Sequence, residues 1–211
     1  MNKNLFYIYL FCFLILGILA SFPKGDLELL INQLYIDGLG QFFKYWTHLG
    51  DGLVYVAIML FFLAYHYYRA ILTATVIIVQ TIFVQIMKRW IFDAPRPKAF
   101  FADMPNVELN FVEGVKVHTA HSFPSGHTAS AFAIATLFSV LIGKHKWSML
   151  LAIMALLVAF SRVYIMQHFF QDVFVGAVIG FLSVFLSQWI LRKAAPGWEA
   201  NAKLQRGLLS K

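Results

Sequence analysis

The chain has 211 residues, of which 60% are hydrophobic and 13% are charged. Soluble domains average about 25% charged residues, so this composition excludes an ordinary soluble protein and predicts an integral membrane protein folded as a single domain, residues 1–211. The net charge of +7 is not clustered as on a basic soluble face, so no nucleic-acid partner is predicted. Cys12 is the single cysteine, so no intrachain disulfide can form.

Six apolar segments approach the length of about 20 mostly apolar residues that a bilayer-crossing helix requires. The predicted fold class is therefore all-α, a bundle of six transmembrane helices in a multi-pass membrane protein. The first segment has a signal peptide as its alternative, because a lysine precedes it and small residues end it. The predicted spans are residues 5–22, 53–68, 70–90, 125–142, 147–164 and 173–191.

Two connections between these spans are long. Residues 25–52 alternate leucines loosely with acidic residues, which predicts an interfacial helix between spans one and two; a packing connector is the alternative. Residues 92–124 carry charges, prolines and several phenylalanines. Loops of this length are usually functional or disordered.

The basic residues are divided almost evenly between the two sides of a six-span chain, so the positive-inside rule hardly decides the orientation. With a cytoplasmic N-terminus, however, basic residues gather at the outer ends of spans three and five. Basic groups kept on the disfavoured side need a reason, and an anionic ligand would supply one. Three polar segments meet at that face: residues 88–97, 124–127 and 161–172.

The residue types in these segments suit a phosphate. Arginine offers planar forks of donors, and backbone N–H groups at a helix start bind anions, with glycine allowing close approach. A serine alone at such a position is more often a helix N-cap, and an arginine near a span end can extend to the interface. The candidate phosphate-binding residues are Lys88, Arg89, Arg96, Ser125, Gly126 and Arg162.

Two histidines and a carboxylate complete the set. His168 and Asp172 are four residues apart, which places them on one face of a helix or across a tight helical end. A carboxylate bonded to one ring nitrogen raises the nucleophilicity of the other, although a structural polar pair is the alternative. His127, from another segment, is placed to protonate a leaving oxygen. This combination suits phosphoryl transfer through a phosphohistidine, with no metal or other cofactor required.

The three segments resemble the signatures of the type 2 phosphatidic acid phosphatase superfamily. Pro124 to His127 matches the second signature, and Ser161 to Asp172 the third. The first signature is a lysine, six further residues and Arg-Pro, and here the chain departs from it. Counting back from Arg96 puts Arg89 at the position of the lysine, and Lys88 lies one residue too early. Either Arg89 fills the role, or the loop has one extra residue and Lys88 keeps it. The resemblance covers residues 88–172.

The resemblance implies that His168 is the nucleophile, Asp172 its orienting partner and His127 the general acid, in a metal-independent reaction. Members of this superfamily act on phosphatidic acid, phosphatidylglycerol phosphate, polyprenyl pyrophosphates and lipid A phosphates. We therefore expect a lipid phosphatase surrounded by membrane lipids, in a bacterial inner membrane, with its site at the periplasmic face. The alternatives are a lipid-to-lipid phosphotransferase and a non-catalytic phospholipid-binding or transport protein. The sequence predicts neither the particular lipid nor the oligomeric state.

Overall fold

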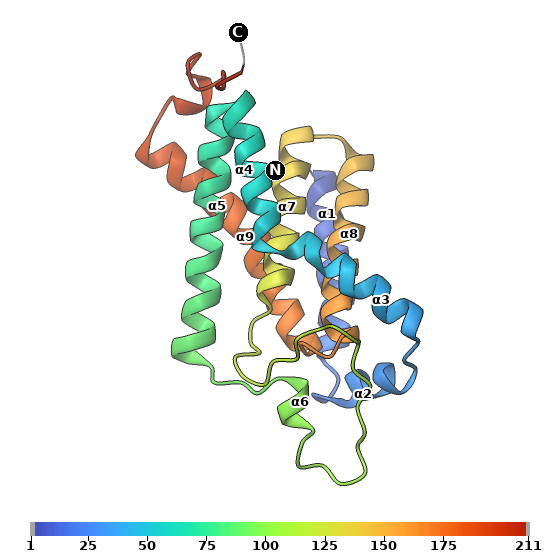
Figure 1. Ribbon diagram of the computed structural model, residues 1–211. Coiled ribbons are helices and arrows are strands. Elements are labelled where there is room, and N and C mark those ends of the chain that lie inside the picture. The colour runs from blue at the N-terminus through green and yellow to red at the C-terminus, as the bar shows by residue number, and fades with distance from the viewer. Residues whose placement is uncertain (1–2, 210–211) are drawn as a thin grey trace.

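A computed structural model describes residues 3–209 and shows helices joined by turns and one long loop (Figure 1). The predicted all-α class is confirmed. The elements in chain order are α1 (Lys3–Ala20), α2 (Asp26–Gln33), α3 (Asp37–Trp46), η1 (Thr47–Gly50), α4 (Gly52–Tyr65), α5 (Tyr67–Ile86), η2 (Met87–Ile91), α6 (Pro97–Phe100), α7 (Gly126–Ile142), α8 (His145–Tyr164), α9 (Phe170–Ala194) and η3 (Trp198–Ala200).

In the part of the chain that the structure describes, four or five helices could span a membrane, whereas the sequence predicted six. Within residues 3–209, four helices are long and apolar enough to cross a membrane: α1, α5 continued by η2, α8 and α9. A fifth span is possible if α3 with η1 and α4, which meet at 45°, are counted as one broken span. The apolar α7 has 17 residues, because it begins only after the polar turn that precedes it. Six spans therefore stay a prediction.

Local capping explains where two of the helices begin. Asp51 accepts a hydrogen bond from Leu53 N–H (3.3 Å) at the start of α4. His66 Nδ1 accepts one from Arg69 N–H (3.4 Å) at the start of α5. Side chains that accept from the first free N–H groups fix a helix start. The break between these helices is therefore at His66, three residues before the position expected from hydropathy.

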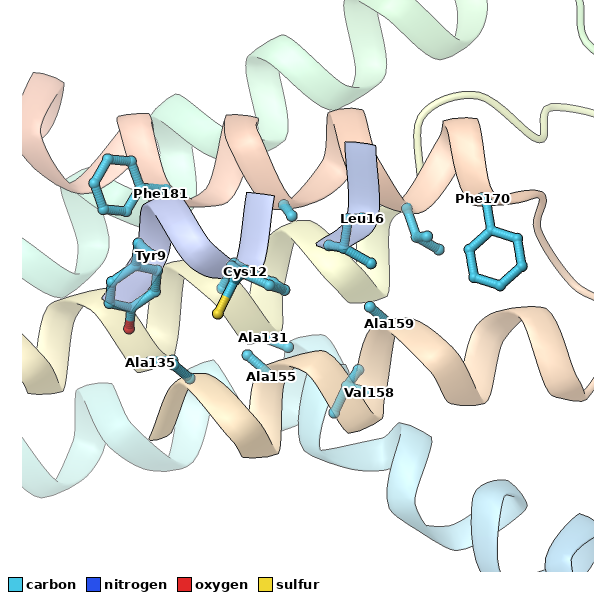
Figure 2. Packing of buried hydrophobic residues seen from close by; sticks show 14 of the residues in the cluster. Tyr9, Cys12, Leu16, Ala131, Ala135, Ala155, Val158, Ala159, Phe170 and Phe181 are labelled. Atoms are coloured by element: carbon cyan, nitrogen blue, oxygen red, sulfur yellow. The ribbon is translucent and has the colours of Figure 1, made fainter. Parts of the chain in front are cut away.

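The core lies where α1, α7, α8 and α9 pack together (Figure 2). Large rings from α1 and α9, such as Tyr9 and Phe181, lie 5.1 Å apart between centroids, and α7 and α8 face them with alanines. α7 and α9 approach so closely at Gly180 that a Cβ on this residue would overlap the Ala129 carbonyl oxygen. Small residues at a helix interface allow this approach in membranes. α1 is therefore an integral part of the packed bundle.

Residues 25–52, where a single interfacial helix was predicted, hold two α-helices, α2 and α3, and the 3-10 helix η1. α2 is fixed by Glu28, which is 1% exposed. Its carboxylate accepts hydrogen bonds from Phe170 N–H (2.8 Å) and Gly25 N–H (3.0 Å). Burial raises the pKa of Glu28. The contact joins α2 to the first residue of α9. α2 therefore packs against the end of the bundle at which α9 begins.

The long loop, residues 92–124, folds back beside its own start. Ser122 N–H donates to the Ala94 carbonyl (2.9 Å). Further out, the loop is tied to α2, because Asn32 and Asn110 exchange side-chain and backbone hydrogen bonds of 2.7–3.0 Å. These bonds hold the loop, which contains α6, over one end of the bundle (Figure 1).

Candidate active site

Segments that are far apart in the sequence meet at the bundle end that carries α6 and the start of α9 (Figure 1). The start of α7 is joined to α9, because Ser125 N–H donates to the Asp172 carbonyl (3.0 Å). The start of the long loop is joined to the α8–α9 connection, because Arg96 Nη1 donates to the Gln167 carbonyl (3.1 Å). The structure thus brings together the three polar segments singled out in the sequence.

His168 lies in the turn between α8 and α9, and Asp172 in the first turn of α9. The chain reverses after α8: Met166 adopts φ 55°, and the N–H groups of Gln167 and His168 donate to the Arg162 carbonyl (3.0 and 3.1 Å). His168 Nδ1 lies 3.3 Å from Asp172 Oδ2, and both side chains are almost fully buried. Because a carboxylate only accepts, this contact places the imidazole proton on Nδ1 and leaves Nε2 with a lone pair.

The surroundings keep this imidazole neutral. Burial lowers the pKa of His168 well below its ordinary value of 6.5, and Arg96, Arg162, Lys88 and His127 lower it further. A neutral imidazole has the lone pair that a nucleophile needs. The cations that repel a proton from His168 also attract an anion to it, so this cluster suits a negatively charged ligand.

Arg162, in the last turn of α8, is 7% exposed. Its Nη1 donates to Thr47 Oγ1 of η1 (3.0 Å). Its Nε, in contrast, is buried and has no hydrogen-bond partner within residues 3–209. Buried donors are nearly always paired, so an unpaired guanidinium nitrogen beside other cations marks a position where an anion would complete the bonding.

Arg96 is held in one orientation by three hydrogen bonds. Its Nε donates to the Ala120 carbonyl (3.0 Å), and its Nη1 to the carbonyl and the Oε1 of Gln167 (3.1 and 3.0 Å). Burial lowers the pKa of Arg96, but a guanidinium stays protonated in proteins. Its charge is therefore fixed beside the turn that carries His168.

The start of α7 has a serine N-cap and a backbone that a ligand can approach. Ser125 Oγ accepts from Thr128 N–H (3.4 Å) and from the Thr128 hydroxyl (3.0 Å). Ser125 is thus the N-cap of α7, and neither bond uses its own hydroxyl hydrogen. A Cβ on Gly126 would meet only Val84 Cγ1, at 3.8 Å, so a ligand has room to approach the backbone there. His127 follows and is half-buried.

The helix that carries Lys88 and Arg89 ends in a π-helical turn, η2. A π-helical turn holds one residue more than an α-helical turn. This extra residue accounts for the position of Lys88, which is one residue earlier than the first signature requires. Lys88 is half-buried and its charge acts on His168. Arg89 is exposed, and its Nε donates to Gln85 Oε1 (2.9 Å). The structure therefore brings Lys88 to the cluster and directs Arg89 away from it.

Sequence reasoning missed several residues that touch this cluster. Thr47 holds Arg162, and Gln167 holds Arg96. Ser122 Oγ lies 2.5 Å from Asp172 Oδ2. Gln167 directly precedes His168, and that adjacency could have drawn attention to it. Thr47 and Ser122 make their contacts across large sequence separations, which no local pattern reveals.

No three His, Cys, Asp or Glu side chains between residues 3 and 209 lie together in a way that could hold a metal ion. That the chemistry needs no metal remains a prediction, which a chelator can test. The arrangement brings a neutral imidazole, a carboxylate on its Nδ1 side and three buried or half-buried cations to one end of the bundle.

The chain is similar in sequence and in fold to several known proteins. A family model described as the PAP2 superfamily matches residues 69–195. An undecaprenyl-diphosphatase of Sulfolobus acidocaldarius is 28% identical over 202 residues, covering 89% of this chain and 91% of that protein. A lipid A 1-phosphatase of Porphyromonas gingivalis is 41% identical over 73 residues, 34% of this chain and only 16% of that protein. The crystal structure of Aquifex aeolicus LpxE superposes with a TM-score of 0.68 at 30% identity, covering 80% of this chain and 97% of that one.

Proposed function

Because the chain belongs to the PAP2 superfamily, whose model matches residues 69–195, we propose that it is a membrane lipid phosphatase. It hydrolyses the terminal phosphate of a lipid phosphate or pyrophosphate through a phosphohistidine, without a metal. The observation that supports this most directly is the buried Arg162 Nε, which has no hydrogen-bond partner within residues 3–209, on a guanidinium whose charge also lowers the pKa of His168. A phosphate oxygen would satisfy that donor, and the phosphorus would then be next to the imidazole.

Arg96, Arg162 and Lys88 neutralise the phosphate charge, which is the main requirement for phosphoryl transfer. Ser125, through its hydroxyl hydrogen, and the Gly126 N–H complete the phosphate-binding site at the start of α7, where free N–H groups and the helix dipole favour an anion. Arg89 is left out of this set, because its guanidinium bonds Gln85 at the surface.

The reaction has two steps. His168 Nε2 attacks phosphorus, the bond to the leaving oxygen breaks, and His127 donates a proton to that oxygen. Asp172 accepts the Nδ1–H hydrogen bond and stabilises the positive charge that develops on the ring. Water then attacks the phosphohistidine, with His127 taking its proton, and inorganic phosphate and the neutral imidazole are released.

For the membrane arrangement, we propose six spans: α1, the broken pair α3 and α4, α5 with η2, α7, α8 and α9. The site lies at the outer end of the bundle, on the periplasmic face of a bacterial inner membrane. The lipid tail stays in the bilayer while its headgroup reaches the cations. This arrangement suits a substrate such as undecaprenyl pyrophosphate, lipid A, phosphatidylglycerol phosphate or phosphatidic acid; the relatives favour the first two as starting points.

The test is phosphate release by purified protein in detergent with a chelator present, on each of these four lipids in turn. We expect release from at least one lipid and loss of nearly all of it in His168→Ala. Transfer of phosphate to a second lipid without free phosphate would identify a phosphotransferase. Unchanged lipid binding together with no turnover on any substrate would contradict the enzyme and favour a lipid-binding protein.

A further inference from the structure

Ser122 lies at the end of the long loop, outside the three signature segments, and is completely buried. Its backbone N–H donates to the Ala94 carbonyl (2.9 Å), which anchors it to the start of the same loop. A buried serine on a loop requires a partner for its hydroxyl. The identity of that partner indicates a role beyond packing.

The Ser122 hydroxyl points at the His168–Asp172 pair. Its Oγ lies 2.5 Å from Asp172 Oδ2 and 3.5 Å from His168 Nδ1. The same carboxylate oxygen also accepts from Phe169 N–H (3.0 Å) and faces His168 Nδ1 (3.3 Å). A separation of about 2.5–2.7 Å is typical of a hydroxyl donating to an ionised carboxylate. Ser122 thus makes the shortest of the contacts to Oδ2.

We propose that Ser122 is a positioning residue for the nucleophile. This inference rests on the proposed function, in which His168 attacks phosphorus. By donating to Oδ2, Ser122 stabilises the ionised carboxylate of Asp172 in a dry environment and keeps that oxygen aimed at His168 Nδ1. Asp172 in turn fixes the tautomer with a free Nε2. Ser122 acts through Asp172 and does not touch the phosphate.

The alternative is a purely structural role, in which the hydroxyl only fills the end of the loop. The two roles predict different kinetics. A positioning residue affects the chemical step, so its loss lowers kcat and leaves KM nearly unchanged. Its effect also depends on Asp172, because the hydroxyl has no carboxylate charge to orient once Asp172 is replaced. Supporting groups of this kind typically change activity by about 10–100-fold.

The experiment measures kcat and KM for phosphate release by wild type, Ser122→Ala, Ser122→Thr, Asp172→Asn and the double variant Ser122→Ala/Asp172→Asn. Thermal unfolding in detergent establishes that each variant is folded. We expect kcat to fall about 10-fold or more in Ser122→Ala with little change in KM. Ser122→Thr, which keeps the hydroxyl, recovers activity. In the Asp172→Asn background, Ser122→Ala has little further effect, as coupled residues require.

Two results would overturn the positioning role. One is wild-type kcat in a folded Ser122→Ala, and the other is a full additional loss when Ser122→Ala is combined with Asp172→Asn. The double-variant comparison remains informative if threonine does not fit the site. His168→Ala separates this inference from the function on which it rests: inactive His168→Ala with fully active Ser122→Ala contradicts only the role of Ser122, whereas active His168→Ala contradicts the phosphohistidine mechanism itself.

Discussion

At the scale of single residues, the site combines a neutral base with fixed positive charges. His168 is neutral because it is buried and because Arg96 and its neighbours lower its pKa. A group whose pKa is depressed remains in its neutral form down to that lower pKa. Activity that depends on the free imidazole is therefore present at neutral pH and is lost as the pH falls through the folded-state pKa, which is below 6.5.

This gives a pH prediction for Arg96→Gln. Arg96 makes the largest charge contribution to the lowered pKa of His168, so its removal raises that pKa. The acidic limb of kcat/KM for the residual phosphate release should move to higher pH. Arg89→Gln is the matched control, because Arg89 lies at the surface and its loss should leave the limb in place. An Arg96→Gln limb at the wild-type pH or lower would contradict this account of the charges.

A second residue-scale prediction separates the two candidates for the first-signature slot. Lys88→Met removes a charge from the proposed phosphate-binding cluster and should lower kcat/KM about 100-fold, a typical loss for one group that stabilises developing charge. Arg89→Met removes the same formal charge at an exposed site and should retain activity near wild type. Kinetics of phosphate release on one lipid measures both. The reverse order of effects would place Arg89 in the slot.

This pair of residues also shows where sequence reasoning stops. Arg96, His127, Arg162 and His168 could be proposed from the sequence, because each of the three signatures that contain them lies in a short stretch of chain. The choice between Lys88 and the next residue was not readable, because it depends on a π-helical turn that changes the direction of the side chains without changing the residues. Contacts such as Ser122 to Asp172 depend on how distant segments fold and leave no periodic pattern.

At the scale of helices, hydropathy located the apolar segments to within a few residues but did not describe their ends. Caps at Asp51 and His66 determine where α4 and α5 begin, and hydropathy does not include capping. The pair α3 and α4 bends by 45°, and a bend of this kind has no signature in mean hydropathy. α2 and α3 were predicted as one helix, because mean hydropathy does not show the break between them.

The contact between α7 and α9 supports a stability prediction. A Cβ on Gly180 would overlap the Ala129 carbonyl, whereas one on the exposed Gly38 of α3 would meet nothing within 4 Å. Gly180→Ala should therefore force the two helices apart at a cost of about 1–3 kcal/mol, seen as a lower thermal unfolding midpoint in detergent. Gly38→Ala should leave the midpoint unchanged or raise it slightly, because alanine favours a helix.

Because α7 and α9 carry the proposed phosphate-binding turn and Asp172, the same substitution should also lower phosphate release at temperatures where the protein is still folded. A Gly180→Ala variant with the wild-type midpoint would mean that the helices have room to separate without loss. In that case the close approach between them would not determine the geometry of the bundle end.

At the scale of the whole molecule, the two ends of the bundle differ in chemistry. One end carries the cation cluster and the long loop with α6; the opposite end carries the start of α1 and the start of α8 (Figure 1). Lys144 and Lys146 lie at the start of α8, and Arg192 and Lys193 lie in the last turn of α9. The positive-inside rule does not choose between the two ends, because the basic residues of the whole chain are divided almost evenly. In the proposed orientation the cation cluster is periplasmic, on the side where basic residues are disfavoured, and an anionic ligand would account for them there.

Thiol labelling in bacterial cells tests this orientation directly. Cys12 is the single cysteine and is buried, so a Cys12→Ser background allows one cysteine to be introduced at a time. Asp103→Cys, in the exposed long loop, should react with a membrane-impermeant maleimide in intact cells with a permeable outer membrane. Lys146→Cys, exposed at the start of α8, should react only after the inner membrane is opened. The opposite result would place the cation cluster in the cytoplasm, and its substrate would then be a lipid of the inner leaflet.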